Sequence, residues 1–391
     1  MNRKAERPHI LVNALLLDTS ATYRGAGISQ YSQALLDAIG RIRPEMDVTV
    51  VTGDKQWSPP TSMHVYRPHW PVRHPVARIA WEQGRLPFLL RTSGAHLYHG
   101  LAFIVPLATR HIPLVVTVHD LSFVHFPETL PPAKALYLKW LTRTSVRRAH
   151  HVIAVSESTR RDVIAWSGIP ARKVSTVPNG VSPRFRPLPP DEVRAWREKK
   201  GLPAHFILYV GTLQPRKNVD TLIRAYARWR GRARTSPPPL ILAGAKGWYY
   251  EDLFRLTASL GLEEAVHFPG YIPPEELPYW YNAATLFAYP SLFEGFGLPV
   301  LEAMACGTPV VAAATSALPE VVGDGGLLLP PKDVDAWAQA LASLLSDPAR
   351  RDELRGRGLQ RAKRFSWERT ARETVAVYHR LLDGYDGRST V

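Results

Sequence analysis

Short apolar runs alternate with longer amphipathic stretches along the whole chain, and this alternation limits the fold more than any other feature. Runs rich in β-branched residues predict buried strands at residues 10–17, 48–52, 114–118, 152–155, 207–210, 240–243 and 286–289. The amphipathic stretches predict helices at residues 27–39, 133–148, 157–166, 219–230, 250–260, 299–305 and 335–345. Apolar strands separated by helices are typical of parallel sheets covered on both faces, so the α/β class is expected.

A proline-rich stretch at residues 182–190 divides the chain. Four of its nine residues are proline, which prevents regular structure and stiffens the connection. Because a new strand is predicted soon afterwards, we expect a first doubly wound, Rossmann-like domain at residues 1–182 and a second at residues 200–366. Sheets of this type bind ligands at the carboxyl ends of their strands, so the site is expected in a cleft between the two domains.

The charge of the chain is strongly positive and unevenly spread. The 391 residues include 49 Lys or Arg and 34 Asp or Glu, which gives a net charge of +15. Residues 1–182 hold 22 Lys or Arg against 11 Asp or Glu, and so carry +11 of that charge. A partner with phosphate or carboxylate groups, or an anionic membrane surface, suits this first half.

Several classes of protein are excluded by what the sequence lacks. One cysteine, Cys306, excludes an internal disulfide framework and a cysteine-based metal cage. No apolar run approaches the ~18 residues of a membrane-spanning helix. The basic start followed by residues 10–17 imitates a signal peptide, but Asn13 and Asp18 interrupt it and no small-x-small cleavage site is present. We therefore expect a cytoplasmic protein.

Two glutamates flank a glycine-rich loop that follows a predicted strand. Glu294 precedes the loop sequence Gly-Phe-Gly-Leu, and Glu302 lies on the helix that Pro299 is suited to begin. Gly295 and Gly297 allow a ligand to approach the backbone, and free N–H groups at a helix start attract phosphate. The two carboxylates can accept hydrogen bonds from sugar hydroxyls and from a ribose diol. The alternative is that Glu294 only caps the helix and that Glu302 is solvated.

Two adjacent cations follow the predicted strand at residues 207–210. A short loop leads from Gly211 to Arg216, Lys217 and Asn218. Arginine offers a planar fork and lysine a point charge, so the pair suits a diphosphate. The alternative is a solvated helix start capped by Asn218, but cations are disfavoured at a helix N-terminus unless an anion compensates them.

The order of these motifs resembles that of the retaining nucleotide-sugar glycosyltransferases of family 4, which have the two-domain GT-B fold. The pattern Gly211…Arg216-Lys217-Asn218 followed by Glu294-x7-Glu302 carries the resemblance. Further segments in the family's order are residues 25–31, 119–120, 156–158, 178–181, 270–271 and 365–368. The match spans nearly the whole chain, and the segments are specific only when taken together.

The resemblance implies a role for each matching residue. Arg216 and Lys217 would hold the donor diphosphate and stabilise the departing charge in place of a metal. Glu294 would bind hydroxyls of the transferred sugar, Glu302 would bind the ribose hydroxyls, and His119 would reach across the cleft to the sugar. His119, Arg216, Lys217 and Glu294 are thus the predicted catalytic residues. The implied donor-binding positions are Gly27, Gly211, Tyr271 and Ile272 beside the nucleobase, Gly295, Phe296, Gly297, Leu298 and Glu302.

The glycine loop at residues 25–31 departs from the family pattern. The family often has Gly-Gly-Ile-Gly-Arg-Tyr, whereas this chain has Ala26, Ser29 and Gln30 at three of those positions. The absence of the arginine weakens the prediction that this loop binds an anionic acceptor. Gly27 and Tyr31 remain candidates for the donor-phosphate and acceptor side.

A basic segment at residues 67–91 is not explained by these motifs. Its five arginines are opposed only by Glu82, and Trp70, Trp81 and Phe88 lie among them. The segment could lie against anionic lipid or contact nucleic acid, although its prolines break any long amphipathic helix. A solvated basic surface beside the cleft is favoured slightly over either.

The resemblance therefore implies a metal-independent, retaining glycosyltransferase that needs no cofactor. It would move a hexose from a nucleoside diphosphate sugar to a glycan or lipid-linked acceptor in polysaccharide or glycoconjugate synthesis. Residues 200–366 would bind the donor, residues 1–182 would bind the acceptor, and the last helix, within residues 367–391, would pack back on the first domain. Residues 244–248 and 119–123 are most similar to mannosyl-type members, which favours GDP-mannose, with UDP-glucose and UDP-N-acetylglucosamine left open.

Three other functions stay open at this stage. A nucleotide-sugar epimerase can have the same fold, but the pairing of Arg216-Lys217 with Glu294 and Glu302 favours transfer. A glycosyltransferase that modifies nucleic acid would explain the charge, although nucleic acid is not the expected partner. A non-catalytic binding module would have lost the site residues, which are all present. Peripheral contact of the protein with an anionic membrane also stays open.

Overall fold

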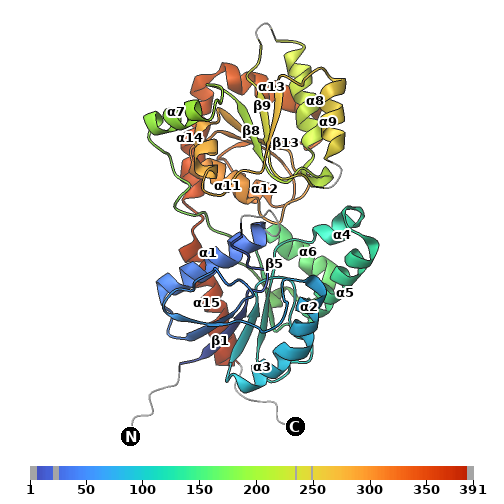
Figure 1. Cartoon of the computed structure of the whole chain (residues 1–391), viewed down its shortest axis with the longest axis vertical. Helices are drawn as coiled ribbons and strands as arrows, with labels where there is room; N and C mark the ends of the chain where they lie inside the picture. The colour runs from blue at the N-terminus through green and yellow to red at the C-terminus, as the bar shows by residue number, and fades with distance from the viewer. Residues whose placement is uncertain (1–6, 21–25, 234–235, 248–249, 385–391) are drawn as a thin grey trace. The chain divides into compact units, whose positions relative to one another are not determined.

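The chain forms two compact units in the computed structural model, which describes residues 7–20, 26–233, 236–247 and 250–384. Unit 1 comprises Met1–Gly180 and Ser366–Val391, and unit 2 comprises Val181–Phe365. Each unit contains a parallel sheet with helices around it (Figure 1), which confirms the predicted α/β class. Gly25, Trp248 and the end of the predicted last helix, residues 385–391, lie outside the described residues.

The sheet of unit 1 has seven parallel strands in the order β3-β2-β1-β4-β5-β6-β7. They are β1 (His9–Asn13), β2 (Asp47–Val51), β3 (Met63–Tyr66), β4 (Leu97–Gly100), β5 (Leu114–Val118), β6 (His151–Ala154) and β7 (Val174–Thr176). Every residue of β5 and β6 is buried, as expected of inner strands covered on both faces.

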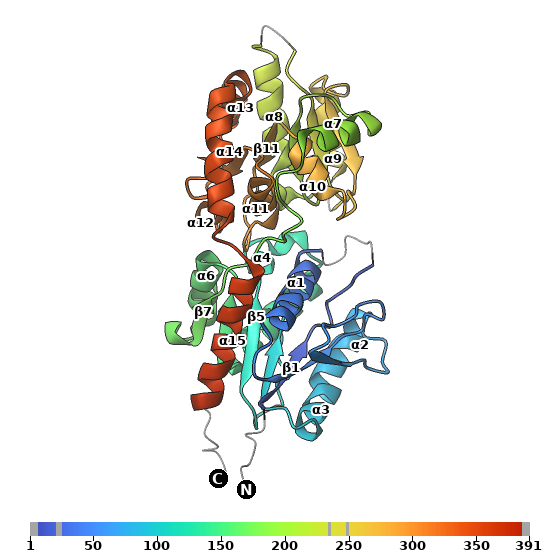
Figure 2. The ribbon, with the colours of Figure 1, turned by 90° about the vertical axis from the view of Figure 1, so that its left-hand side faces the viewer.

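Helices cover both faces of this sheet (Figures 1 and 2). On one face α1 (Ala26–Ile42) packs against α15 (Trp367–Gly384), so the last helix of the chain is part of unit 1. On the other face lie α2 (Pro75–Ala80), α3 (Leu86–Thr92) and α5 (Pro132–Arg148), and a π-helical turn, Trp81–Arg85, joins α2 to α3. The unit also contains α4 (Ser122–His125) and α6 (Glu157–Ser167).

The sheet of unit 2 has six parallel strands in the order β10-β9-β8-β11-β12-β13. They are β8 (Ile207–Val210), β9 (Leu240–Ala243), β10 (Val266–Gly270), β11 (Leu286–Tyr289), β12 (Val310–Ala313) and β13 (Leu327–Leu329). The helices are α7 (Pro190–Lys199), α8 (Val219–Arg230), α9 (Glu251–Ser259), α10 (Leu277–Ala283), α11 (Leu298–Ala305), α12 (Leu318–Val322), α13 (Val334–Ser346) and α14 (Pro348–Ala362).

The first predicted strand, residues 10–17, is too long. Strand β1 ends at Asn13, because the Asn13 side chain accepts a hydrogen bond from the Leu15 amide at 3.1 Å and turns the chain out of the sheet. The Leu17 amide then donates to the Ala14 carbonyl at 3.0 Å, which closes the turn. By contrast, β5, β8, β9 and β11 begin and end where the sequence predicts them.

Each sheet has one position at which the strand order reverses. In unit 2 the chain runs from β8 through β9 to β10 and then returns to β11, on the other side of β8. In unit 1 it runs from β1 through β2 to β3 and then returns to β4. Open parallel sheets bind ligands beyond the carboxyl ends of the strands at such positions, so the loops after β8 and β11 are where a ligand of unit 2 is expected.

Among the described residues, no helix combines the length and the apolar character needed to cross a membrane.

Candidate functional site

The two motif loops of unit 2 lie side by side at the carboxyl edge of its sheet. One loop follows β8 and leads through a short 3₁₀ turn, Pro215–Lys217, into α8, and the other follows β11 and leads into α11. Because β8 and β11 are neighbouring parallel strands, both loops leave the sheet at the same place. The Leu292 amide donates to the Arg216 carbonyl at 2.9 Å, which ties one loop to the other.

Lys217 and Glu294 form a buried ion pair between these loops. The Lys217 Nζ donates to the Glu294 Oε1 at 2.5 Å and to the Tyr289 hydroxyl at 2.8 Å, and that hydroxyl donates to the same Oε1 at 3.0 Å. Lys217 and Glu294 are each only 8% exposed. The structure therefore excludes the alternative in which this cation is simply solvated at a helix start.

The electrostatics of this pair favour its charged form. Burial alone would raise the pKa of Glu294, but the charges of Lys217 and Arg216 outweigh it and lower that pKa from 4.5 to about 2. Burial and the nearby Glu294 carboxylate raise the pKa of Tyr289 well above its ordinary value, so its hydroxyl keeps its proton. At neutral pH the site thus holds a carboxylate, a neutral phenol and two cations.

Arg216 extends the cluster beyond Lys217. Its Nη1 lies 3.5 Å from the Glu294 Oε2 and donates a hydrogen bond to the Phe293 carbonyl. Asn218 fixes the loop behind both cations, since its Nδ2 donates to the carbonyls of Pro290 and Pro331 at 3.0 and 2.6 Å. Asn218 also adopts a left-handed backbone conformation, with φ 55°, that asparagine tolerates better than most residues.

Two predicted glycines lie close to neighbouring side chains. Gly297 precedes α11 with φ 103°, and a Cβ there would lie 2.7 Å from the Leu318 side chain. A Cβ on Gly211 would lie 2.7 Å from the Tyr209 hydroxyl. The glycines therefore let the loops pass close to their neighbours, beside the ion pair.

The start of α11 offers fewer donors to a phosphate than the sequence predicts. Pro299 has no N–H, and the amides of Val300 and Leu301 already donate to the Gly297 carbonyl at 3.1 and 3.3 Å. Of the amides in this first turn, that of Leu298 is the one left for a ligand. The neighbouring Glu294 amide donates to the Ser316 hydroxyl at 2.8 Å, so that amide is not available to a ligand.

Three other predicted residues of unit 2 lie apart from the ion pair. Glu302 is 4% exposed on α11 and its Oε2 accepts a hydrogen bond from the Tyr281 hydroxyl at 3.0 Å, so it is not the solvated carboxylate of the alternative reading. Tyr271 and Ile272 follow β10, two strands away from β8 along the same sheet edge. Tyr271 is 39% exposed, whereas Ile272 is buried.

His119 lies at the end of β5 in unit 1. Its Nε2 donates to the Leu101 carbonyl at 2.7 Å, so the Nδ1 of the neutral ring is left as an acceptor. Burial lowers the pKa of His119, which favours that neutral form. The Tyr31 ring meets the imidazole edge-on with centroids 4.6 Å apart, and Phe103 does so at 5.7 Å.

A buried hydrogen-bonded chain behind His119 was beyond the sequence prediction. His99 Nε2 lies 2.8 Å from the Thr117 hydroxyl, and its Nδ1 lies 2.6 Å from the Tyr378 hydroxyl. The Tyr31 hydroxyl lies 3.3 Å from the same threonine. Because Tyr378 is on α15, this helix supports that end of the sheet. Of the residues in the hydrogen-bonded chain, only Tyr31 was a candidate from the sequence.

Gly27, another predicted site residue of unit 1, is exposed in the first turn of α1.

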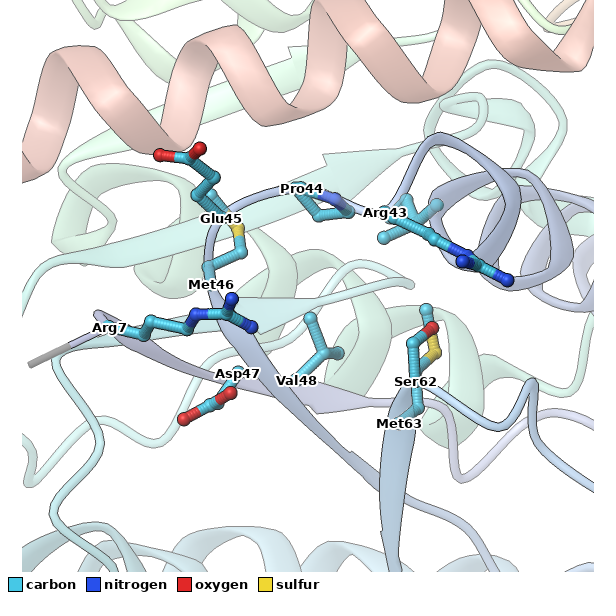
Figure 3. A pocket seen from close by; sticks show the side chains of 10 residues that line it. Arg7, Arg43, Pro44, Glu45, Met46, Asp47, Val48, Ser62 and Met63 are labelled. Atoms are coloured by element: carbon cyan, nitrogen blue, oxygen red, sulfur yellow. The ribbon is translucent and has the colours of Figure 1, made fainter.

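A cavity of about 270 Å³ in unit 1 is separate from these residues. It lies at the amino end of β2, opposite the carboxyl edge where the motif residues of each unit are found. Arg7, Glu45 and Asp47 line one end, and Arg43 and Ser62 line the other (Figure 3). The cavity coincides with none of the predicted site residues.

Within the described part of the chain, no three His, Cys, Asp or Glu side chains are grouped so that they could hold a metal ion.

Comparison with known proteins identifies the sequence over most of its length. A family model described as "Glycosyl transferases group 1" matches residues 192–361, and one described as "Glycosyltransferase Family 4" matches residues 27–185. The chain is 38% identical over 298 residues to the O-antigen chain mannosyltransferase B of Escherichia coli, covering 76% of this chain and 77% of the relative. It is 34% identical over 304 residues to the D-inositol 3-phosphate glycosyltransferase of Kribbella flavida, covering 72% and 70%.

Solved structures resemble the fold over nearly the whole chain. Sucrose-phosphate synthase from Thermosynechococcus elongatus matches with a TM-score of 0.77 at 24% identity, covering 97% of this chain and all of that one. WaaG, a glycosyltransferase involved in lipopolysaccharide biosynthesis, matches with a TM-score of 0.74 at 16% identity, covering 94% and 99%. These likenesses confirm the predicted fold class, two Rossmann-like sheets of the GT-B type.

Proposed function

Because the chain belongs to the group 1, family 4 glycosyltransferases, we propose that it transfers mannose from GDP-mannose to a glycan or lipid-linked acceptor. That it is a glycosyltransferase follows from the family; the donor and acceptor are the proposal. Its support is the similarity to two kinds of E. coli mannosyltransferase, the second being the serotype-specific WbdA, 30% identical over 73% of this chain and 36% of the relative. We further propose that the sugar keeps its anomeric configuration and that no metal takes part.

The observation that carries the proposal is the buried cluster of Arg216, Lys217 and Glu294. Its two cations share one carboxylate at distances of 2.5 and 3.5 Å, so the cluster has an excess of one positive charge. A diphosphate adds two negative charges, and moving it beside these cations compensates that excess. The tethered loops hold both cations in place before a donor arrives.

The same residues suit the transfer step. When the bond from the sugar to the diphosphate breaks, negative charge grows on the departing phosphate oxygen, and Arg216 and Lys217 stabilise it without having to move. The acceptor hydroxyl attacks the sugar carbon, and its proton passes to that phosphate oxygen. Glu294, ionised because of its two cations, accepts hydrogen bonds from sugar hydroxyls.

The remaining predicted residues take binding roles in this proposal. Glu302 binds the ribose hydroxyls in exchange for the Tyr281 hydroxyl, and Tyr271 contacts the nucleobase. His119 offers its Nδ1 as the acceptor for a hydroxyl of the transferred sugar. Gly27 leaves room for the donor phosphate and the acceptor at the start of α1. The enzyme would work in the cytoplasm, with peripheral contact to an anionic membrane.

Mass spectrometry of products from a mixed donor pool tests the proposal. The chain is incubated with GDP-mannose, UDP-glucose and UDP-N-acetylglucosamine, with and without a mannose-terminated acceptor, in excess EDTA. We expect one hexose on the acceptor, derived from GDP-mannose, with the α-configuration of the donor retained by NMR. Transfer of glucose, inversion, or a need for magnesium would each contradict the corresponding part, and an epimerised nucleotide sugar formed without acceptor would identify an epimerase.

A further inference from the structure

Large apolar side chains are exposed on the outer helices of unit 1. Val76 on α2, Phe88 on α3, and Leu136 and Trp140 on α5 are exposed by 68%, 64%, 71% and 60%. Trp70, which precedes α2, is 44% exposed and is held on that helix by a hydrogen bond from its indole to the Ala77 carbonyl. A helix that covers a sheet normally turns polar residues outward, so these positions need another explanation.

The exposed residues belong to one face of unit 1. Leu86 and Leu90 of α3 and Val146 of α5 join the same core cluster, so both helices cover the same face of the sheet (Figure 1). Tyr137 of α5 interacts electrostatically with Arg78 of α2 and with Glu82 of the π-helical turn, so α5 lies close to α2 and that turn. The outward side chains of neighbouring helices on one sheet face point to the same side. We call this surface the outer face of unit 1, defined by Trp70, Val76, Phe88, Leu136 and Trp140.

The two segments that form the outer face carry charge of almost a single sign. Residues 67–92 and 132–148 contain ten Lys or Arg and one acidic residue, Glu82, and Glu82 is buried. In the described part of unit 1, ion pairs are formed by Arg41, His125, Arg160 and Arg369, and by no cation of these two segments. Arg78 interacts electrostatically with the buried Glu82, so most of the positive charge of the two segments, but not all of it, is left without an acidic partner in those segments.

From this surface we infer that the outer face of unit 1 docks onto an anionic lipid bilayer. Exposed tryptophan, phenylalanine and leucine side chains insert among lipid chains, while the surrounding arginines and lysines bind lipid phosphates. The apolar stems of those long side chains can lie in the interface as well. Nucleic acid would use the cations but would not bury Val76 or Leu136, so the aliphatic side chains favour lipid.

The inference rests on the proposed function only for the location of the acceptor. If the acceptor is lipid-linked, this docking brings unit 1, the proposed acceptor-binding unit, to the membrane that carries it. Binding to vesicles is measured without turnover, so the docking and the transfer reaction can fail separately.

Co-sedimentation of the full chain with vesicles tests the docking. We expect at least tenfold tighter binding to phosphatidylcholine vesicles containing about one third phosphatidylglycerol than to pure phosphatidylcholine, with weakening at high salt. The double variants Leu136→Ser/Trp140→Ser and Arg85→Glu/Arg91→Glu should each lose about tenfold of that binding. Both should keep the thermal stability and the transfer rate to a water-soluble acceptor, since the changed residues are exposed.

Exposed residues of unit 2 provide matched controls. Leu260→Ser, and the double reversal Lys199→Glu/Lys332→Glu, change an exposed leucine and two exposed lysines of unit 2 and should leave vesicle binding unchanged. A fluorophore on Leu136→Cys should brighten and shift to the blue with anionic vesicles, and one on Leu260→Cys should not. Cys306 is 4% exposed and does not compete for the label.

Three results would overturn the inference. The first is equal binding, or none, to both kinds of vesicle. The second is a loss of binding in the unit 2 controls as large as that in the outer-face variants. The third is binding of a single-stranded RNA, rather than vesicles, that the outer-face variants abolish, which would make the surface a nucleic-acid interface.

Discussion

The two units place their charges in different positions. In unit 2, two cations and a carboxylate lie buried together between the loops that follow β8 and β11. In unit 1 burial favours the neutral form of the predicted catalytic residue, His119, which lies between aromatic rings, and ten cations lie in the segments 67–92 and 132–148. Unit 1 nevertheless carries most of the net charge of the chain.

The difference shows that the net charge of a unit does not indicate where the charged residues of a binding site lie. A buried cation costs free energy unless a partner compensates it, and in unit 2 the buried Lys217 is paired with Glu294. An exposed cation costs little, and many of them together attract an anionic surface over a distance of about 10 Å. The buried cluster suits a single diphosphate, whereas the outer face of unit 1 suits an extended partner.

The largest expected effect comes from removing Lys217. Lys217→Ala should lower kcat by about a thousandfold, because the departing phosphate loses a prepositioned cation. It should also destabilise unit 2 by about 3 kcal/mol, because Glu294 is left buried without its main partner. Steady-state kinetics and thermal unfolding measure the two effects.

Two further variants separate activity from stability. The double variant Lys217→Met/Glu294→Gln removes both charges, and should recover much of the lost stability while remaining inactive. Arg228→Ala breaks an exposed ion pair with Asp335 in the same unit, and should change stability by less than about 1 kcal/mol and leave kcat unchanged. A fully active double variant would show that the buried pair has no part in the reaction.

The pH dependence of stability comes next. The pKa of Glu294 is lowered from 4.5 to about 2 in the folded chain. A depressed carboxyl pKa stabilises the fold above the unfolded-state value and loses that effect as the pH falls through the folded one. The shift corresponds to about 3 kcal/mol, so the advantage of the wild type over Glu294→Gln should be constant above pH ~4.5 and shrink toward pH ~2.

Urea unfolding of both proteins at a series of pH values measures this difference. An advantage that stayed constant down to the lowest pH would mean that Glu294 is not held ionised by its cations. The corresponding substitution in unit 1, His119→Asn, should show a different pH range. Because the pKa of His119 is lowered from 6.5 in the folded chain, the wild type should lose stability relative to this variant as the pH falls below 6.5, well above the range in which Glu294 titrates.

The smallest expected effect concerns the backbone of the glycine loop. Gly297→Ala should destabilise the chain by about 1–2 kcal/mol, because φ is 103° there and the new Cβ would meet Leu318. Gly356→Ala, in the middle of α14 with open space around it, should instead stabilise by about 0.5–1 kcal/mol. Thermal unfolding compares the two, and equal effects would show that Gly297 is not constrained.

The sequence predicts where the two loops of the unit 2 site lie along the chain, but it does not predict which of their side chains contact each other. Continuous apolar strands and the motifs beside them place Lys217 and Glu294 at strand ends, and the strands before them are correct to the residue. That the two side chains are buried against each other depends on β8 and β11 being neighbours, although 75 residues lie between the end of β8 at Val210 and the start of β11 at Leu286. The same holds for the contact of Ser316 with the Glu294 amide, because a serine in a loop has no pattern that reveals its partner.

Weak strands and side-chain networks were also beyond prediction. β10 contains Pro269 and Gly270, and β13 has three residues, so neither has a recognisable period. The early end of β1 depends on one hydrogen bond to the Asn13 side chain. The link from His99 to Tyr378 joins the fourth strand to the last helix, 279 positions apart, and only the folded chain brings them together.

Calorimetric titration of GDP tests the central claim, that the buried cluster of unit 2 holds the donor diphosphate, most directly. Wild type and Arg228→Ala should bind GDP equally, and Lys217→Ala should bind it at least about thirtyfold more weakly, since a charge-assisted contact is lost. His119→Ala, which changes unit 1, should bind GDP as the wild type does, because its proposed contact is with the sugar. Unchanged GDP affinity in Lys217→Ala would contradict the account.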